Sequence, residues 1–474
     1  MANWLTLRLV GLFQDRVIRN ITLTVATRAV AFACTVVATI IAGRYLGPSD
    51  FGRLNFALGF VTLAISITEL MAGTIATREI ARHREMASAH LSSLIGARLI
   101  SVLAACVITL FAILFVNDPV TQLLLILAML QLPAWIPQSA EVWFVASIDL
   151  TLPNIFRVIS HGALLILTIA IVFYGKGVLW LMAVNTASLW LYSVLTFGAA
   201  STKVHMRVPS LESAFNLLRR SFAFGIASTI WRLQSQLPMS LVYLACGSFQ
   251  AGLYAAASKF IAVADWSISA FTLSLYPAMS EVVDDRELFR QRLIGGLAMM
   301  CAFGMALATF VASCSSALIQ LTFGSQFAGA HRVLVALSPT LLFMFASSHL
   351  AHALISLGGR SQYFSSACVA ALSTFILVTS LGKLMGALGS AVGMSLASLI
   401  ALVASAVMIH RLDGKLVPWG WFALRASATV ALVGVALMFG LTVQNLFVEL
   451  AFGISLSMLA FLTWRRYGST QQNV

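Results

Sequence analysis

The sequence predicts an all-α membrane protein of about fourteen transmembrane helices, arranged as two six-helix lobes and a C-terminal helix pair. Two observations carry this prediction. The 474 residues are 60% hydrophobic and 9% charged, with a mean hydropathy of +0.95, whereas soluble domains carry about 25% charged residues. Apolar runs of about 18 residues or more also recur along the whole chain, and each is long enough for a membrane-spanning helix.

The expected spans follow one another with short connections. They lie at residues 20–43, 55–77, 93–116, 120–146, 155–173, 178–198, 219–245, 251–279, 293–317, 331–357, 363–381, 387–409, 426–443 and 446–464. The longest connection, 199–218, separates an N-lobe (1–198) from a C-lobe (219–410) and is expected on the cytoplasmic side. Residues 411–474 hold the appended last two spans and a tail.

A glycine-punctuated stretch occurs twice, 200 residues apart, and predicts an internal repeat. Residues 44–60 read RYLGPSDFGRLNFALGF and residues 243–260 read YLACGSFQAGLYAAASKF, so that Gly47 matches Gly247 and Gly52 matches Gly252. Glycine supplies turn conformations that bulkier residues resist. Because each lobe holds an even number of spans, both lobes share one orientation, and a pseudo-twofold axis along the membrane normal is expected.

The net charge of +13 is interpreted as a topology signal. Most of the 29 Lys and Arg residues lie in connections on the side of the N-terminus, which the positive-inside rule places in the cytoplasm together with the C-terminus. These cations would face anionic lipid headgroups, so we expect no nucleic-acid partner. The N-terminus lacks a small-residue cleavage site after a short apolar core, and no removed signal peptide is expected.

The cysteines predict neither a disulfide framework nor a metal site. They are dispersed without a C-x-x-C motif, at Cys34, Cys106, Cys246, Cys301, Cys314 and Cys368. Five fall within apolar spans, where a free cysteine packs as a small hydrophobic residue. No cofactor is expected.

Several stretches, in order, resemble the bacterial polysaccharide exporters, the O-antigen (Wzx-type) lipid-linked oligosaccharide flippases of the multidrug/oligosaccharidyl-lipid/polysaccharide exporter superfamily. They are GRYLGPSDFGRLNFA, TIATREIARHRE, AGLYAAASKF, LYPAMSE, LIQLTFGSQFAGAHRVL and LMGALGSAVGMSLA. The likeness covers about the first 410 residues, and the last two spans fit by hydropathy.

The resemblance implies a non-enzymatic transporter in the bacterial inner membrane. Its cargo would be an undecaprenyl-pyrophosphate-linked oligosaccharide, such as an O-antigen, capsule or exopolysaccharide repeat unit, moved from the cytoplasmic to the periplasmic leaflet. The implied mechanism is alternating access driven by an ion gradient, with H⁺ or Na⁺ as the coupling ion. Partners would be the lipid-linked glycan and membrane lipids, and the participation of other polysaccharide-assembly proteins stays open.

Three cations are expected inside spans, where an ionised side chain costs at least ~2.5–3.5 kcal/mol. They are Arg28, Arg232 and Lys259. The functional interpretation is a basic, water-filled cavity for a pyrophosphate, which an arginine can bind through paired hydrogen bonds. The structural alternative is pairing with a carboxylate, or a side chain that reaches the membrane interface.

Three carboxylates are also expected inside spans: Glu69, Glu141 and Asp265. They could couple transport to H⁺ or Na⁺, or neutralise the three in-span cations. Pairing is favoured for Glu69 and Asp265. Glu141 lies in the polar and aromatic run PQSAEVWF, where sugar contact and helix packing are equally compatible with the sequence.

Other polar and aromatic side chains have weaker functional interpretations. Trp231, Trp143 and Tyr254 are candidate sugar contacts, although aromatic residues in membrane helices more often pack or anchor. His161, His349 and His352 are expected in packing or hydrogen bonding. Pro133, Pro137, Pro238 and Pro277 are expected to kink or break helices. Arg78, Arg82, Arg84 and Arg98 flank a cytoplasmic connection and could gather an anionic headgroup, but topology alone accounts for them.

Two other functions are compatible with parts of the pattern. A multidrug or cation antiporter of the same superfamily would need net negative charge in its cavity, whereas this chain places three in-span cations against Glu69 and Asp265. A membrane-embedded glycan polymerase or glycosyltransferase would need a sizeable loop with acidic or histidine groups. The longest loop here is basic, and the Asp284–Asp285 pair lies in a short connection beside Arg286.

Overall fold

The structure is a computed structural model that describes residues 2–205, 207–414 and 416. Side chains are described from residue 22 onward, except at 223, 224, 264–267, 269, 270 and 272–274. The α-helices are α1 (Ala2–Glu69), α2 (Ala72–Arg82), α3 (Ala87–Ile113), α4 (Pro119–Met129), α5 (Glu141–Ala146), α6 (Thr151–Phe173), α7 (Val178–Ser201), α8 (Leu211–Ser280), α9 (Arg286–Ser313), α10 (Ser315–Thr322), α11 (Ala330–Ser356) and α12 (Arg360–Leu412). Short 3-10 helices lie at Arg84–Met86, Leu132–Trp135, Pro137–Ala140 and Ser325–Phe327.

The predicted all-α membrane architecture is confirmed over the described residues. Eight of their helices are long and apolar enough to cross a membrane. The segment Thr22–Glu69 has 48 residues, which at ~1.5 Å per residue is far longer than the ~30 Å hydrocarbon core of a bilayer. It therefore has the length of two spans. The last two expected spans, at 426–443 and 446–464, lie outside the described residues.

The described residues divide into two compact units. The first unit is formed by residues up to Leu46 and by Ala57–Thr229, and the second by Gly47–Phe56 and the described residues from Ile230 onward. The boundary after Thr229 falls inside α8, so it lies beyond the connection at 199–218 that the sequence suggested.

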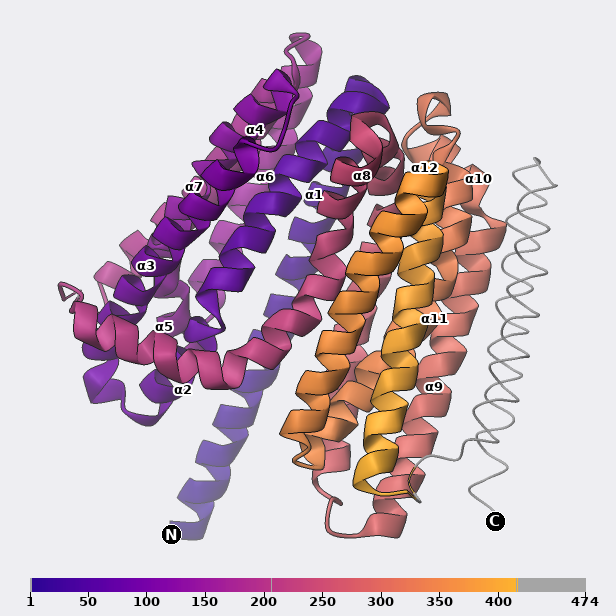
Figure 1. Cartoon of the computed structure of the whole chain (residues 1–474). Helices are drawn as coiled ribbons and strands as arrows, with labels where there is room; N and C mark the ends of the chain where they lie inside the picture. The colour runs from indigo at the N-terminus through magenta and orange to yellow at the C-terminus, as the bar shows by residue number, and fades with distance from the viewer. Residues whose placement is uncertain (1, 206, 415, 417–474) are drawn as a thin grey trace. The chain divides into compact units, whose positions relative to one another are not determined.

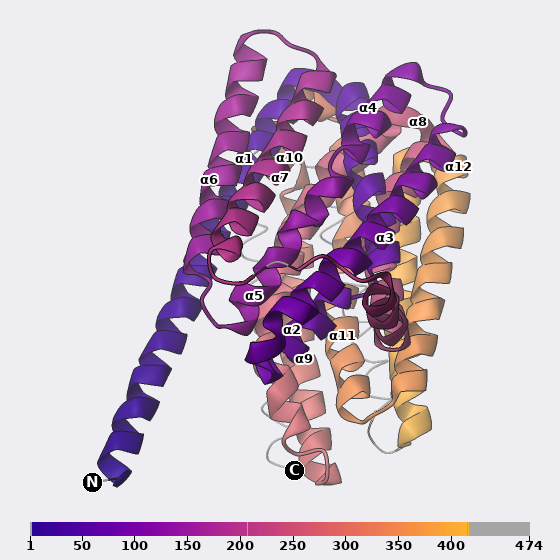
Figure 2. The ribbon, with the colours of Figure 1, turned by 90° about the vertical axis from the view of Figure 1, so that its left-hand side faces the viewer.

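The first unit contains α2–α7 and the adjoining parts of α1 and α8. Helix α6 packs along α7, and α2 packs against α3 and α5 (Figure 2). A buried cluster joins α2, α3 and α5 through Ala72, Ala76, Ile80, Leu94 and Val142. In the second unit, α11 contacts both α9 and α12 (Figure 1). A buried cluster of this unit includes Phe289, Leu297, Met305, Leu342 and Leu350.

Single glycines divide the three longest helices into two parts each. Gly47 in α1 has φ 71° and ψ 175°, and Gly247 in α8 has φ 81° and ψ 177°. Gly386 divides α12 with φ 65°. Backbones in this region are essentially restricted to glycine. The matching dihedral angles of Gly47 and Gly247 support the predicted repeat, and each expected turn is reduced to a one-residue break.

The two repeat copies contact each other reciprocally within the second unit. A Cβ atom at Gly52 would overlap the carbonyl oxygen of Ser248, and a Cβ atom at Gly252 would overlap that of Pro48. Pro48 and Ser248 occupy equivalent positions of the two copies. Gly52 of the first copy meets Ser248 of the second, and Gly252 of the second copy meets Pro48 of the first. Such a reciprocal contact has local twofold character. The glycines are needed here because the two backbones approach directly.

Two of the expected spans are interrupted. The second ends early, because Leu70 (φ 47°) and Met71 (φ 62°) adopt left-handed conformations between α1 and α2. The fourth is split at Pro133 and Pro137, which are the second and the first residue of two 3-10 helices between α4 and α5. Proline lacks the backbone donor that a continuous helix requires, so the predicted breaks at Pro133 and Pro137 are confirmed.

Candidate functional site

Glu69 forms a shielded ion pair with an arginine of the first unit. Glu69 ends α1, and Arg98 lies on α3 with its Nη2 2.8 Å from Glu69 Oε1. The Arg98 and Glu69 side chains are only 8% and 16% exposed. Arg98 Nη1 also donates to the carbonyl of Trp135, at 3.0 Å, in the proline-broken segment. One guanidinium thus joins the end of α1, α3 and the break after α4.

A second charged cluster joins α5, α6 and α7. Arg157 Nη2 lies 2.6 Å from Glu141 Oε1 and donates to the Tyr192 hydroxyl oxygen at 2.9 Å. The guanidinium carbon also lies 5.3 Å from the centroid of the Tyr192 ring, within cation–π range. Tyr192 is buried, with 6% of its surface exposed. The two charges and the hydroxyl therefore satisfy one another inside the helical unit.

These partners differ from the expected ones. The sequence suggested that Glu69 would neutralise Arg28, Arg232 or Lys259. It counted Arg98 and Arg157 among the cytoplasmic-side cations, although they fall near the ends of the expected spans 93–116 and 155–173. Helix α3 begins earlier than expected, at Ala87, so that Arg98 lies about 16 Å along it at ~1.5 Å per residue. The side chain of Asp265 lies outside the described residues.

Lys259, in the second unit, binds a neutral amide. Its Nζ donates to Asn55 Oδ1 at 2.8 Å, and Asn55 Nδ2 donates in turn to the carbonyl of Phe51 at 2.9 Å. Lys259 makes no ion pair with the side chains that the structure describes. The lysine therefore ties α8 to the Gly47–Phe56 segment.

Arg28 and Arg232 are the exposed in-span cations. Both side chains are solvent- or lipid-accessible, and neither forms an ion pair within the described part of its unit. Trp231, beside Arg232, packs edge-on against Tyr363 with 6.3 Å between ring centroids. These two guanidinium groups remain available to an anionic ligand.

The aromatic candidates occupy different environments. Tyr254 is 4% exposed and lies in the core of the second unit, a position that favours packing over sugar contact. Trp143 is half-buried and meets Phe144 edge-on, with 5.0 Å between ring centroids. Trp231 is also half-buried.

The histidines are held in hydrogen bonds, as the sequence suggested. His161 Nδ1 lies 2.8 Å from Thr35 Oγ1, His349 Nε2 lies 3.1 Å from the carbonyl oxygen of Leu293, and His352 Nδ1 lies 2.7 Å from that of Ser348. Within the described ranges, no group of three or more His, Cys, Asp or Glu residues could hold a metal ion. All six cysteines are free thiols.

Comparison with known proteins gives this arrangement a family. Residues 17–283 match the family model described as "Polysaccharide biosynthesis protein". The chain belongs to this family. One similar protein is the succinoglycan biosynthesis transport protein ExoT of Rhizobium meliloti (strain 1021). The two sequences are 24% identical over 458 residues, which cover 94% of this chain and 92% of ExoT.

Solved structures show the same fold at low sequence identity. The lipid II flippase MurJ, in an inward closed conformation, matches with a TM-score of 0.75 at 16% identity, covering 96% of this chain and 100% of that one. An inward-facing MATE-family multidrug resistance transporter of the MOP superfamily matches with a TM-score of 0.66 at 13% identity, covering 81% and 96%. The predicted exporter-superfamily fold is therefore confirmed.

Proposed function

We propose that this chain is a flippase for an undecaprenyl-pyrophosphate-linked oligosaccharide. It would carry a repeat unit of an O-antigen, capsule or exopolysaccharide from the cytoplasmic to the periplasmic leaflet of the inner membrane by alternating access. Membership of the polysaccharide biosynthesis family supports this proposal. So does the similarity to ExoT, which is named as a succinoglycan biosynthesis transport protein. The fold shared with the lipid II flippase MurJ agrees with this proposal.

The distribution of in-span charge carries the choice of an anionic cargo. Each described in-span carboxylate is engaged by an arginine, Glu69 by Arg98 and Glu141 by Arg157. Arg28 and Arg232 have no such counter-charge among the described side chains of their units. An exporter of organic cations requires exposed negative charge, whereas open guanidinium groups suit phosphate oxygens.

The proposal includes coupling to an H⁺ or Na⁺ gradient, with Glu69, Glu141 and Asp265 as candidate coupling residues. Both pairs that the structure describes are shielded, so protonating either carboxylate would release a buried arginine. Such a release could be linked to a conformational change. Transport into proteoliposomes under an imposed pH or Na⁺ gradient distinguishes the two ions.

The deciding experiment is complementation of a deletion strain. Surface polysaccharide and lipid-linked intermediate are measured with wild type, Arg28→Ala, Arg28→Lys and Arg232→Ala, all at checked membrane abundance. Lys176→Ala, at an exposed turn after α6, is the matched control. Loss of polymer with intermediate retained in the cytoplasmic leaflet is expected for the deletion and for both alanine variants, and normal polymer for Lys176→Ala.

Other outcomes would refute the assignment. Unchanged glycan with raised sensitivity to cationic drugs would identify an antiporter. Intermediate that reaches the periplasmic leaflet but stays unpolymerised would identify a membrane-embedded polymerase. Intermediate that is never completed would identify a glycosyltransferase.

A further inference from the structure

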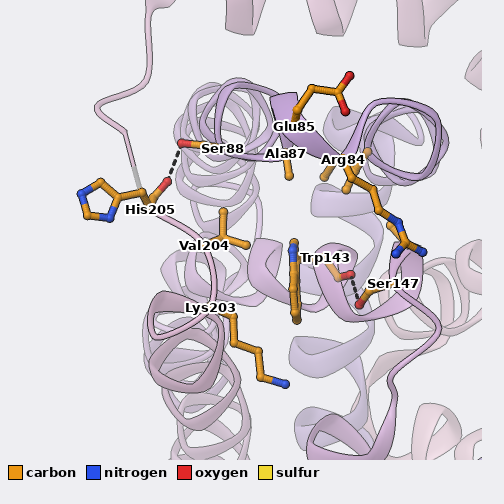
Figure 3. A pocket seen from close by; sticks show the side chains of 11 residues that line it. Arg84, Glu85, Ala87, Ser88, Trp143, Ser147, Lys203, Val204 and His205 are labelled. Carbon is orange, nitrogen blue, oxygen red and sulfur yellow. Dashed lines mark hydrogen bonds between the residues drawn. The ribbon is translucent and has the colours of Figure 1, made fainter.

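A pocket at one end of the first unit has the chemistry of an anion site. It encloses about 380 Å³ between the start of α3, the end of α5 and the chain that follows α7. Figure 3 shows Trp143 between Arg84 and Lys203, while the carboxylate of Glu85 points away from the indole. The pocket therefore combines two cations with one aromatic wall.

Hydrogen bonds fix the walls of this pocket. Ser147 Oγ donates to the carbonyl of Trp143 at 2.8 Å, a hydrogen bond that closes the C-terminal turn of α5. Ser88 Oγ donates to the carbonyl of His205, which anchors the chain after α7 to the first turn of α3 (Figure 3). These two hydrogen bonds hold the C-terminal end of α5 and the chain after α7 in place as walls of the pocket.

Lys203 is positioned over the aromatic wall and is only loosely paired. Its Nζ lies 5.3 Å from the centroid of the Trp143 ring and 3.4 Å from Asp149 Oδ2. Charge-assisted hydrogen bonds are usually about 2.7–2.9 Å long. The ammonium group therefore keeps donor capacity for a further anion.

Arg84 supplies the second cation, and its charge is available. It is exposed and makes no ion pair with any described side chain. Arg78, in the same basic run, is instead bound to Glu79 with Nη2 3.0 Å from Oε1, and this bond holds the pKa of Glu79 below its usual range. Of these two arginines, Arg84 is the one that lines the pocket, and it is unpaired among the described side chains.

The position of the pocket in the chain points to a lipid ligand. Its walls are the ends of three candidate spans, Arg84–Ile113, Pro119–Ala146 and Val178–Ser201. Span ends lie at the depth of lipid headgroups, where tryptophan is enriched and basic pockets between helices bind anionic headgroups. We propose that this pocket binds a lipid-borne phosphate, with Arg84 and Lys203 as donors and Trp143 as the wall. The proposal does not depend on the flippase assignment.

The phosphate could belong to a bulk membrane lipid or to a polyprenyl carrier lipid. Each is tested against a matched lipid that lacks the phosphate. Purified full-length protein in detergent is titrated with phosphatidylglycerol against diacylglycerol, and with undecaprenyl pyrophosphate against undecaprenol, by native mass spectrometry. If the site recognises the phosphate alone, phosphatidylglycerol and undecaprenyl pyrophosphate are expected to compete with each other for one binding site. Binding confined to phosphatidylglycerol would assign a bulk-lipid site, and binding confined to undecaprenyl pyrophosphate would assign a carrier-lipid site.

The variants decide whether the pocket is responsible. Arg84→Gln and Lys203→Met remove charge at exposed positions and are expected to weaken binding at least tenfold, with unchanged elution in size exclusion. Lys176→Met removes an exposed charge from another loop of the same unit and should leave binding as it is. Equal loss in the Lys176 variant, or equal binding of the phosphate-free lipids, would overturn the proposal.

Discussion

Replacing Arg98 by methionine tests whether the Glu69–Arg98 pair holds the first unit together. Methionine keeps most of the side-chain volume, but leaves the Glu69 carboxylate at 16% exposure without its cation. It also removes the donor that binds the Trp135 carbonyl at 3.0 Å. Breaking a buried ion pair from one side costs about 3–5 kcal/mol, and we expect a loss of that size in the free energy of unfolding.

The assay is equilibrium unfolding of purified protein in mixed detergent and SDS micelles, completed as a double-mutant cycle. Glu69→Gln should destabilise the protein similarly, because it leaves Arg98 buried without a counter-charge. The double variant Glu69→Gln/Arg98→Met leaves neither charge of this pair buried without its partner and should cost clearly less than the two single losses together. A loss below about 1 kcal/mol for Arg98→Met, or strict additivity in the cycle, would refute this reasoning.

Three further substitutions address single contacts. Gly252→Val places a Cβ atom 2.6 Å from the Pro48 carbonyl carbon, so little monodisperse protein should be recovered in fluorescence-detected size exclusion; wild-type recovery would contradict the close approach. Gly247→Ala meets no atom within 4 Å, and only its backbone at φ 81° is strained, which predicts a loss of about 1–3 kcal/mol in the same unfolding assay. An alanine variant as stable as wild type would argue against that conformation. Tyr192→Phe removes the acceptor of a charged donor from Arg157 but keeps the ring, so we expect a loss of about 1.5–3 kcal/mol; an unchanged stability would show that the hydroxyl contributes nothing.

The sequence was sufficient for the helical architecture and for its main breaks. Apolar run length sets span positions, since a bilayer demands a minimum helix length. Gly47 and Gly247 marked breaks, and Pro133 and Pro137 marked others, because these residue types change the backbone directly. The left-handed break at Met71 was not foreseeable, since Leu70 and Met71 carry no local signal. In the structure the Leu70 carbonyl lies directly against Gly225 of α8, a contact that the local sequence does not reveal.

The ionic partners were harder to predict than the ionic residues. Hydropathy located Glu69 and Glu141, but counting cations by loop treated Arg98 and Arg157 as topology signals. A long arginine side chain can lie several residues inside a span, and span ends read from hydropathy are uncertain by that amount. For Tyr254 a signal did exist: the surrounding small residues of AGLYAAA allow close helix packing, and all seven positions from Ala251 to Ala257 are buried.

The reciprocal contact at Gly52 and Gly252 sets how the two halves of the chain can vary. In a dimer of identical half-length proteins, one codon change at the twofold point would alter both sides of the contact at once. Joining the halves into one gene frees each side to change separately. Pro48 and Ser248 differ at equivalent positions, whereas Gly52 and Gly252 are identical. The two copies thus differ in side chain where a residue contributes its backbone carbonyl, and they agree where a side chain would block the approach of the two main chains.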